Sequence, residues 1–206
     1  MAKLNRLQMA SLPDPVLDRR TAVPALIERP QDFLVVAGLA GAAQELTAMT
    51  NDAPSVFGLG GAMGSACAMG LGLALAQPKR RVIAITGDGE LLMNLGCLAT
   101  IALLNPPNLT VICVDNGHYG ETGNQESHTG LGVRLDTVAT GAGFPAVCTI
   151  NTEAELAEGR RLLREGEGLC FILLRVKDGP ALKNKRNLQP AIARTRFRES
   201  LLGANG

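Results

Sequence analysis

Residues 81–89 read RVIAITGDG and residues 109–117 read LTVICVDNG, and these two stretches decide the fold. Each begins as an apolar run rich in β-branched residues, without polar alternation, and each ends in a short polar turn. Such runs are typical of strands that are buried on both faces of a parallel sheet. A helix is expected between them over residues 90–104, because Asn105-Pro106-Pro107 would stop it there.

The rest of the chain continues the same alternation of strands and helices. Thr152 and Glu155 form a capping-box pattern at the start of one expected helix. The order predicts an α/β fold, a three-layer α/β/α arrangement with a mainly parallel sheet that binds ligands at the carboxyl ends of its strands. Further strands are expected at 33–37, 146–150 and 170–176, and further helices at 41–50, 63–76, 135–143 and 152–164.

We divide the 206 residues into an N-terminal arm (1–30), a ligand-binding domain (31–178) and a basic C-terminal tail (179–206) with a final helix near 191–202. Residues 175–198 hold eight of the 20 Lys and Arg residues. We interpret them as a solvated or subunit-contacting face. Binding of an anionic substrate there is a weaker alternative, and nucleic-acid binding is weaker still, since Phe197 is the one aromatic residue in that stretch.

Composition argues against several classes of partner. The net charge of +1 gives no global reason to expect nucleic acid or a membrane, and an aromatic content of 3% without Trp argues against stacking on single strands. The five cysteines include no CxxC pair, and there are two histidines, which favours reduced thiols over a zinc site. Because the first 20 residues lack the apolar stretch of a signal peptide, we expect a cytoplasmic protein.

The stretch 53–78 carries no charge over 26 residues, which is long enough to span a bilayer. It consists mostly of Gly and Ala, a weakly hydrophobic mixture. We therefore favour a Gly-rich turn followed by a fully buried helix over residues 63–76, and we expect no membrane partner.

Asp88 and Asn116 follow the two strands quoted at the outset. Gly87 and Gly89 would let the backbone turn sharply and approach a ligand, and the helix start after them favours an anion. A carboxylate beside such an anion requires a cation between them, and Mg²⁺ takes carboxylate and amide oxygens together with phosphate and water. The simpler alternative for each motif is a tight turn, with Asp88 as a helix N-cap. Together the two motifs favour a metal-bridged phosphate site.

Gly87-Asp88-Gly89, then 25 residues, then Asp115-Asn116 resembles the cofactor motif of thiamin-diphosphate-dependent enzymes, with Asp115 in place of the first Asn of the usual pair. The fuller pattern over residues 87–125 resembles the cofactor-binding subunits of sulfopyruvate and phosphonopyruvate decarboxylases. The resemblance covers residues 33–177 and implies their fold and two cofactors, thiamin diphosphate and Mg²⁺. It implies that Asp88, Asn116 and the backbone carbonyl of His118 bind the metal.

The resemblance also assigns roles in cofactor binding. Met63 would be the apolar wedge that bends the cofactor, and the Gly61 carbonyl would accept a hydrogen bond from its pyrimidine amino group. Without the Gly-Asp-Gly motif, a core Met beside packing glycines would be the better interpretation of this turn. The cofactor-binding residues implied are Gly61, Ala62, Met63, Gly87, Asp88, Gly89, Glu90, Asn116, Tyr119 and Gly120.

One part of such a site is missing from the sequence. In the family that it resembles, the glutamate that activates the pyrimidine lies on a second domain, and only 32 residues precede the first expected strand here. The resemblance therefore implies a hetero-oligomer with a pyrimidine-binding subunit that supplies that glutamate. It implies a lyase that decarboxylates a small anionic 2-oxo acid. A carboligase or synthase, a 2-oxo acid oxidoreductase and a non-catalytic thiamin-diphosphate-binding protein remain alternatives.

Some residues depart from the family pattern. Glu90 stands where many relatives have a small hydroxyl residue near the diphosphate, so its carboxylate must point away or bind another group. Glu121 lies one residue from the position of an acid in simpler decarboxylases, and it is a candidate for proton transfer. Tyr119, Gln125 and His128 are candidates to line the same pocket, although solvated loop residues are the simpler interpretation.

Overall fold

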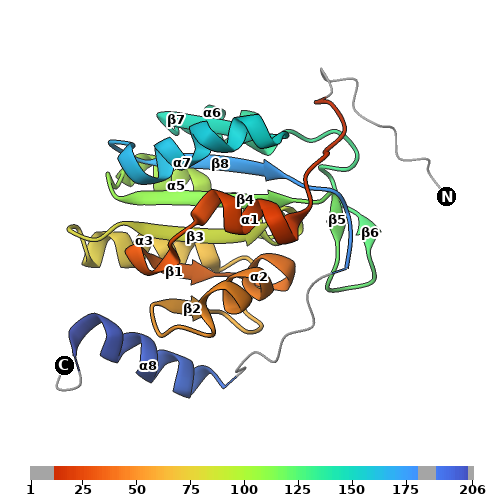
Figure 1. The fold of residues 1–206 in the computed structure, drawn as a ribbon. Helices are drawn as coiled ribbons and strands as arrows, with labels where there is room; N and C mark the ends of the chain where they lie inside the picture. Colours follow the sequence, from red (N-terminus) through yellow and green to blue (C-terminus); the bar gives the residue numbers. More distant parts are fainter. Residues whose placement is uncertain (1–11, 181–188, 204–206) are drawn as a thin grey trace.

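The computed structural model describes residues 12–180 and 189–203. Six parallel strands form one sheet in the order β2-β1-β3-β4-β8-β7 (Figure 1). This arrangement confirms the predicted parallel sheet. The strands are β1 (Leu34–Ala37), β2 (Val56–Gly58), β3 (Val82–Gly87), β4 (Leu109–Asp115), β7 (Ala146–Ile150) and β8 (Cys170–Arg175).

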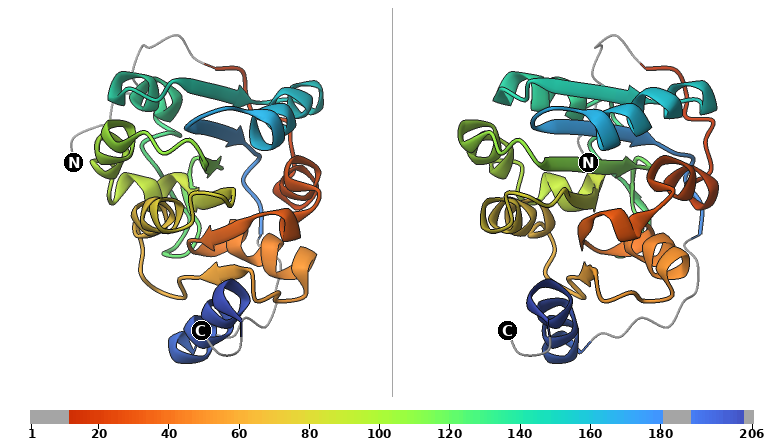
Figure 2. Two further views of the ribbon diagram at one scale, coloured as in Figure 1. Left: turned by 90° about the vertical axis from the view of Figure 1, so that its left-hand side faces the viewer. Right: turned by 60° about the vertical axis from the view of Figure 1, so that its left-hand side comes forward.

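Helices cover both faces of the sheet, which gives three layers (Figure 2). One face packs against α1 (Arg19–Ile27), α2 (Ala40–Thr50) and α7 (Leu156–Glu165). The other packs against α3 (Ala66–Ala76), α5 (Cys97–Leu104) and α6 (Leu135–Ala142). The shorter elements are η1 (Pro30–Asp32), α4 (Asp88–Leu92), β5 (His118–Tyr119), β6 (Gln125–Glu126) and η2 (Glu153–Glu155), and α8 (Pro190–Leu202) lies near the C-terminus.

The strands alternate between two hydrophobic cores, which explains why their sequences show no polar alternation. In β3, Ile83 and Ile85 face the core with α1 and α2, whereas Val82 and Ala84 face the core with α3 and α5. All four side chains are at most 1% exposed. Both faces of the strand are thus apolar, as a sheet covered on both sides requires.

Between β1 and β3, the chain connections run to opposite edges of the sheet. From β1 the chain passes through α2 to β2 on one side, and from β3 it passes through α4 and α5 to β4 on the other. At such a point the connections on either side diverge and leave a crevice at the carboxyl ends of the strands, where α/β proteins bind ligands. The ribbon β5–β6 lies at this end of the sheet (Figure 1).

Two of the predicted helices differ from the structure. The helix expected over 90–104 is divided into α4 and α5, separated by a turn at residues 93–96 in which the Asn94 amide donates to the Gly64 carbonyl at 3.0 Å. The helix expected from residue 63 begins at Ala66, because Gly60 (φ +58°) and Gly64 (φ +79°) hold the preceding segment in left-handed turns.

The α3 helix is not fully buried as the sequence suggested, since Met69 and Leu75 are 43% and 51% exposed. The uncharged stretch 53–78 divides into β2, a turn and an α3 of 11 residues. Within residues 12–180 and 189–203, no helix combines the length and the apolar character needed to cross a bilayer.

The α8 helix packs against β2 at the edge of the sheet (Figure 1). The rings of Phe57 and Phe197 lie 5.4 Å apart, and Nη1 of Arg196 donates to Asp52 at 2.7 Å. Part of the basic tail therefore contacts this chain itself. At the other end, α1 packs its buried side chains into the core. Residues 1–11, 181–188 and 204–206 lie outside the described residues, and the division into arm, domain and tail stays a prediction.

Candidate functional site

A cavity of about 460 Å³ opens at the carboxyl ends of β1, β3 and β4. It is lined by the connections that follow these strands, by residues 178–180 after β8, and by Arg19 and Met63. The structure brings most of the predicted site residues together here. Lining residues from that set are Met63, Gly87, Asp88, Gly89, Glu90, Asn116, His118, Tyr119, Gly120 and Glu121.

Four of the candidates do not line this cavity. Gly61 and Ala62 lie in the exposed turn before α3, and the Gly61 carbonyl accepts the Met63 N–H at 3.1 Å. Gln125 and His128 lie in the ribbon and the loop after it, where His128 Nδ1 lies 3.1 Å from the Tyr119 hydroxyl. Their predicted contacts with the cofactor stay predictions.

One of the two glycines around Asp88 has a packing role that the sequence did not indicate. Neither adopts a positive φ, and Gly87 has an extended conformation that any residue tolerates. A Cβ on Gly89, however, would lie 2.4 Å from the Tyr119 ring. Gly89 is therefore needed so that the loop after β4 can close over the start of α4.

Asp88 is a buried acid, 2% exposed, at the start of α4. The Ser127 hydroxyl donates to its Oδ2 at 2.5 Å, and the Thr129 hydroxyl lies within bonding distance of both this oxygen, at 3.0 Å, and Asp115 Oδ1, at 2.7 Å. Burial, reinforced by the nearby charge of Asp115, raises the pKa of Asp88 to about 6 even though these hydroxyls oppose the rise. A cation bound at this carboxylate would relieve the cost of its ionisation.

Asn116 reaches the same edge as Asp88 because β3 and β4 pair in register, Gly87 with Val114. Its amide NH₂ donates to Oδ1 of Asp178 at 3.0 Å, and its Oδ1 accepts the His118 N–H at 3.3 Å. Asp178 thus fixes which end of the amide is the donor. The amide oxygen is then the atom that Asn116 presents on the side away from Asp178.

These residues fit a hard cation. Asp88, Asn116 and His118 all line the cavity and offer carboxylate, amide and carbonyl oxygens, which are the donors that Mg²⁺ prefers. No group of three or more His, Cys, Asp and Glu able to hold a metal occurs in the part of the chain that the structure describes. The predicted ligands are one carboxylate, one amide oxygen and one backbone carbonyl, so they do not form a group of such side chains.

Glu90 turns its carboxylate toward the connection after β1. Its Oε2 accepts the Leu39 N–H at 3.0 Å and the Thr86 hydroxyl at 2.9 Å, whereas its buried Oε1 has no partner among the described residues. A Cβ on Gly38 would lie 1.9 Å from Oε2, so a glycine there makes room for this acid. The carboxylate thus binds a backbone N–H, one of the two possibilities expected from the sequence.

Several residues at the site were not identified from the sequence. Ser127 and Thr129 belong to a polar loop without periodicity, so nothing distinguished them from solvated residues. Asp178 lies three residues after the end of β8, and its place just beyond a strand was a usable signal. Arg19 lies in a segment expected to be an arm, and no local pattern connects it with the cavity.

Residues 38–173 match the family model described as "Thiamine pyrophosphate enzyme, C-terminal TPP binding domain". The chain belongs to this family. The chain is 38% identical over 143 residues to the sulfopyruvate decarboxylase subunit beta of Methanocaldococcus jannaschii. This match covers 68% of this chain and 74% of that one. It is also 36% identical over 175 residues to the phosphonopyruvate decarboxylase of Streptomyces viridochromogenes, covering 84% of this chain and 43% of that protein.

The fold agrees with that family. A thiamin-diphosphate-dependent enzyme from Mycobacterium smegmatis, described as putative, superposes with a TM-score of 0.66 at 20% identity, over 85% of this chain and 35% of that one. The comparisons confirm the predicted fold, the thiamin-diphosphate cofactor and a cofactor-binding subunit of a decarboxylase. The metal and the individual site residues stay predictions.

Proposed function

We propose that this chain holds thiamin diphosphate through Mg²⁺ in a decarboxylase for a small anionic 2-oxo acid of the sulfopyruvate or phosphonopyruvate kind. The observation that carries the proposal is the buried carboxylate of Asp88, held on one oxygen by two hydroxyls and placed in one cavity with Asn116 and His118. The relatives named for these two substrates support the substrate class.

The metal would be held by Asp88, by the amide oxygen of Asn116 and by the carbonyl of His118. Mg²⁺ would neutralise the diphosphate charge beside Asp88, which the buried carboxylate would otherwise repel. Bound thiamin diphosphate would supply the electron sink that makes loss of CO₂ from a 2-oxo acid possible. The chain itself would bind, orient and shield the reacting groups.

Two side chains at the cavity would act on the reacting end. Met63 lines the cavity and is 45% exposed, so it offers an apolar surface against which a bent cofactor can rest. Glu121 also lines it, and we propose this carboxyl group as the one that moves a proton to or from the substrate carbon.

A separate pyrimidine-binding subunit would complete the site and supply the activating glutamate. The sequence of α3, ACAMGLGLALA, contains no polar side chain, yet Met69 and Leu75 on it are exposed. A helix that is apolar all round is normally buried. Met63 and Met93, which line the cavity, are also exposed, at 45% and 53%, and we propose that one partner covers α3 and closes the cofactor site.

The experiment is purification of the tagged chain from its native cells, followed by mass spectrometry and assays of the intact complex. We expect a co-purifying subunit, Mg²⁺-dependent binding of thiamin diphosphate, and CO₂ release from sulfopyruvate or phosphonopyruvate. Binding of the cofactor without CO₂ release from any 2-oxo acid would contradict the decarboxylase. Product formation only with an added aldehyde, or only with an electron acceptor, would instead indicate a carboligase or an oxidoreductase.

A further inference from the structure

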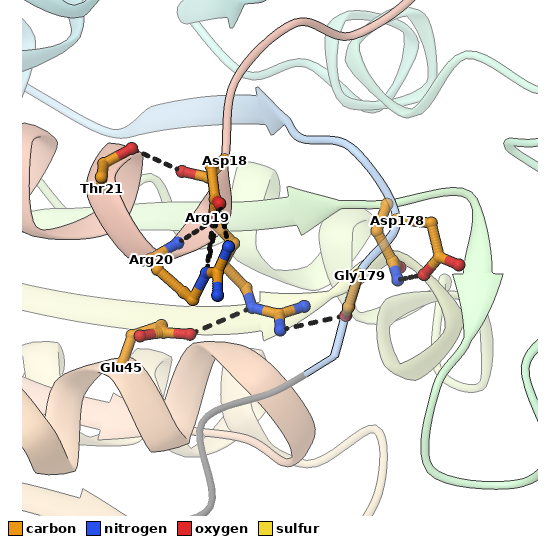
Figure 3. A network of polar contacts seen from close by, with 8 residues as sticks. Asp18, Arg19, Arg20, Thr21, Glu45, Asp178 and Gly179 are labelled. Carbon is orange, nitrogen blue, oxygen red and sulfur yellow. Dashed lines mark hydrogen bonds and ion pairs between the residues drawn. The ribbon is translucent and has the colours of Figure 1, made fainter.

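Arg19 places a cationic side chain in the wall of the cofactor cavity. It is the first residue of α1, and its side chain is 10% exposed. Figure 3 shows its guanidinium between Glu45 of α2 and the backbone at Gly179. Among the described residues that line the cavity it is the one Arg or Lys, whereas the acids Asp88, Glu90, Glu121 and Asp178 all contribute to the lining.

The guanidinium has more donors than the protein uses. Nε donates to Glu45 Oε1 and Nη2 donates to the Gly179 carbonyl, both at 3.4 Å. Such bonds are long, since N–H···O distances rarely exceed about 3.2 Å. Nη1 has no hydrogen bond to any residue that the structure describes. A buried guanidinium with five N–H donors and two long bonds has capacity for a further acceptor of negative charge.

The first turn of α2 faces the same space. Gly41 and Ala42 line the cavity, and Leu39, at the N-cap position, provides no side-chain acceptor. The N–H groups of a first helical turn have no partner within the helix, and they carry the positive end of its dipole. The start of α2 and Arg19 thus favour the same sign of charge in a ligand.

Gly41 lets these two groups meet. A Cβ at this position would lie 2.2 Å from Cζ of Arg19, so the guanidinium rests directly on the first turn of α2. Glu90, an acid in the same cavity wall, contacts Gly38 and Leu39 instead. Glu45, 1% exposed, balances the charge of Arg19 from the helix below.

We propose that Arg19 and the first turn of α2 form a subsite for a tetrahedral oxyanion, separate from the metal ligands. Two sources carry that chemistry, the terminal phosphate of the cofactor and the sulfonate or phosphonate group of the substrate. The inference rests on the proposed function and adds to it the group that binds the second anionic part of the ligands. Arg19 is then a binding residue of the site.

The test compares three substitutions with one matched control in the full chain, purified with any subunit that accompanies it. Arg19→Met removes the cation, Arg19→Lys keeps the charge but loses the planar fork, and Gly41→Ala displaces the guanidinium while favouring the helix. Arg20→Met is the control, because Arg20 is the neighbouring residue, exposed and paired with Asp18 at the surface (Figure 3). Arg19→Met combined with Glu45→Gln avoids an unpaired buried acid should Arg19→Met alone unfold.

Binding is measured by calorimetry with thiamin diphosphate and with pyrophosphate, each with Mg²⁺, and KM is measured for the anionic 2-oxo acid. Loss of a charged hydrogen bond predicts roughly tenfold to a hundredfold weaker binding in Arg19→Met, with Arg19→Lys between it and the wild type. If the cofactor and pyrophosphate affinities fall, the subsite takes the terminal phosphate. If these affinities hold and KM rises by that factor, the subsite takes the acidic group of the substrate.

Unchanged affinities and unchanged KM in a folded Arg19→Met protein would overturn the subsite. The proposed function would survive that result as long as the wild type binds thiamin diphosphate and Asp88→Ala does not. If the wild type itself fails to bind the cofactor with Mg²⁺, the proposed function and the subsite both fail.

Discussion

The environment of Asp88 is unfavourable for a charged carboxylate. Asp88 is buried, its neighbour Asp115 is also an acid, and the side chains that bond it offer neutral hydroxyls. Burial raises its pKa to about 6, so the fold bears a cost for keeping it ionised at neutral pH. A cation bound at Asp88 would offset that cost, which agrees with the metal site that we propose.

Asp88→Ala is expected to abolish Mg²⁺-dependent binding of thiamin diphosphate and to leave the fold intact, because it removes a buried charge and no apolar packing. Calorimetric titration of the cofactor with and without Mg²⁺ measures the first effect, and thermal unfolding measures the second. Wild-type affinity in this variant would show that the metal lies elsewhere.

Ser127→Ala is expected to weaken Mg²⁺ binding by about 10-fold to 100-fold, the usual effect of removing a group that orients a metal ligand. The Ser127 hydroxyl, fully buried, donates to Asp88 Oδ2 at 2.5 Å and fixes the orientation of the carboxylate. Ser200→Ala is the matched control, since Ser200 bonds the Pro54 carbonyl at the surface. Equal metal affinity in both variants would contradict this role for Ser127.

Met63→Ala is expected to lower kcat of the assembled enzyme more than it lowers cofactor affinity. The Met63 side chain is apolar and would contact the reacting end of the cofactor. It makes no charged contact, so the diphosphate should still bind. Steady-state kinetics together with cofactor titration separate the two effects. A variant with unchanged kcat would rule out the wedge.

At the scale of elements, the sequence predicts best where the hydrophobic pattern is strongest. The strands expected at 81–86, 109–114 and 170–176 agree with β3, β4 and β8 to within one residue at each end. An uninterrupted β-branched run between two turns leaves few alternatives. The start of α3 and the break between α4 and α5 were missed. The start of α3 follows the left-handed turns at Gly60 and Gly64, and the turn between α4 and α5 contacts that segment through the bond from Asn94 to Gly64, which is far from it in the sequence.

The site was predictable in the same uneven way. Asp88 and Asn116 follow strands, so their positions could be derived from the order of the sheet. Arg19 comes from α1, which packs on one face of the sheet. Ser127 comes from the loop that follows β6. Residues of this kind reach a site through tertiary packing, which a local pattern cannot encode.

The capping box of Thr152 and Glu155 at η2, the short helix just before α7, supports a prediction about pH. Glu155 accepts the Asn151 and Thr152 N–H groups at 2.6 and 2.8 Å, and these bonds hold the pKa of its carboxyl group below the ordinary value of 4.5. A lowered pKa means that the ionised carboxyl group stabilises the fold above pH 4.5, and that this stabilisation is lost as the pH falls through the lowered pKa.

Glu155→Gln should therefore lower the free energy of unfolding by about 0.5–1 kcal/mol at pH 7, the size of a typical cap. The difference from wild type should shrink toward zero under acidic conditions. Urea unfolding at several pH values measures it, with Glu153→Gln in the same turn as the control. A difference that does not change with pH would show that the charge of Glu155 is not involved.

At the scale of the whole molecule, we propose the exposed apolar side chains of α3 as the contact with the partner subunit. Met69→Glu should disrupt assembly with the partner subunit and abolish turnover, because it places a charge in the proposed contact. The chain should still fold, since Met69 is 43% exposed. Size-exclusion chromatography of the mixed subunits measures assembly.

Ala157→Glu is the matched control for that substitution, an exposed apolar residue of α7 on the opposite face of the sheet. It should assemble normally. Normal assembly of Met69→Glu would move the interface away from α3.

The packing of α8 against β2 has a consequence for aggregation. The outermost strand of an open sheet exposes unpaired backbone groups, to which a strand of another molecule can add. In this protein Phe197 and Arg196 hold a helix against that strand, through Phe57 and Asp52. The C-terminal helix therefore acts as a guard against strand addition, and shortened forms of the chain would be the ones that form insoluble polymers.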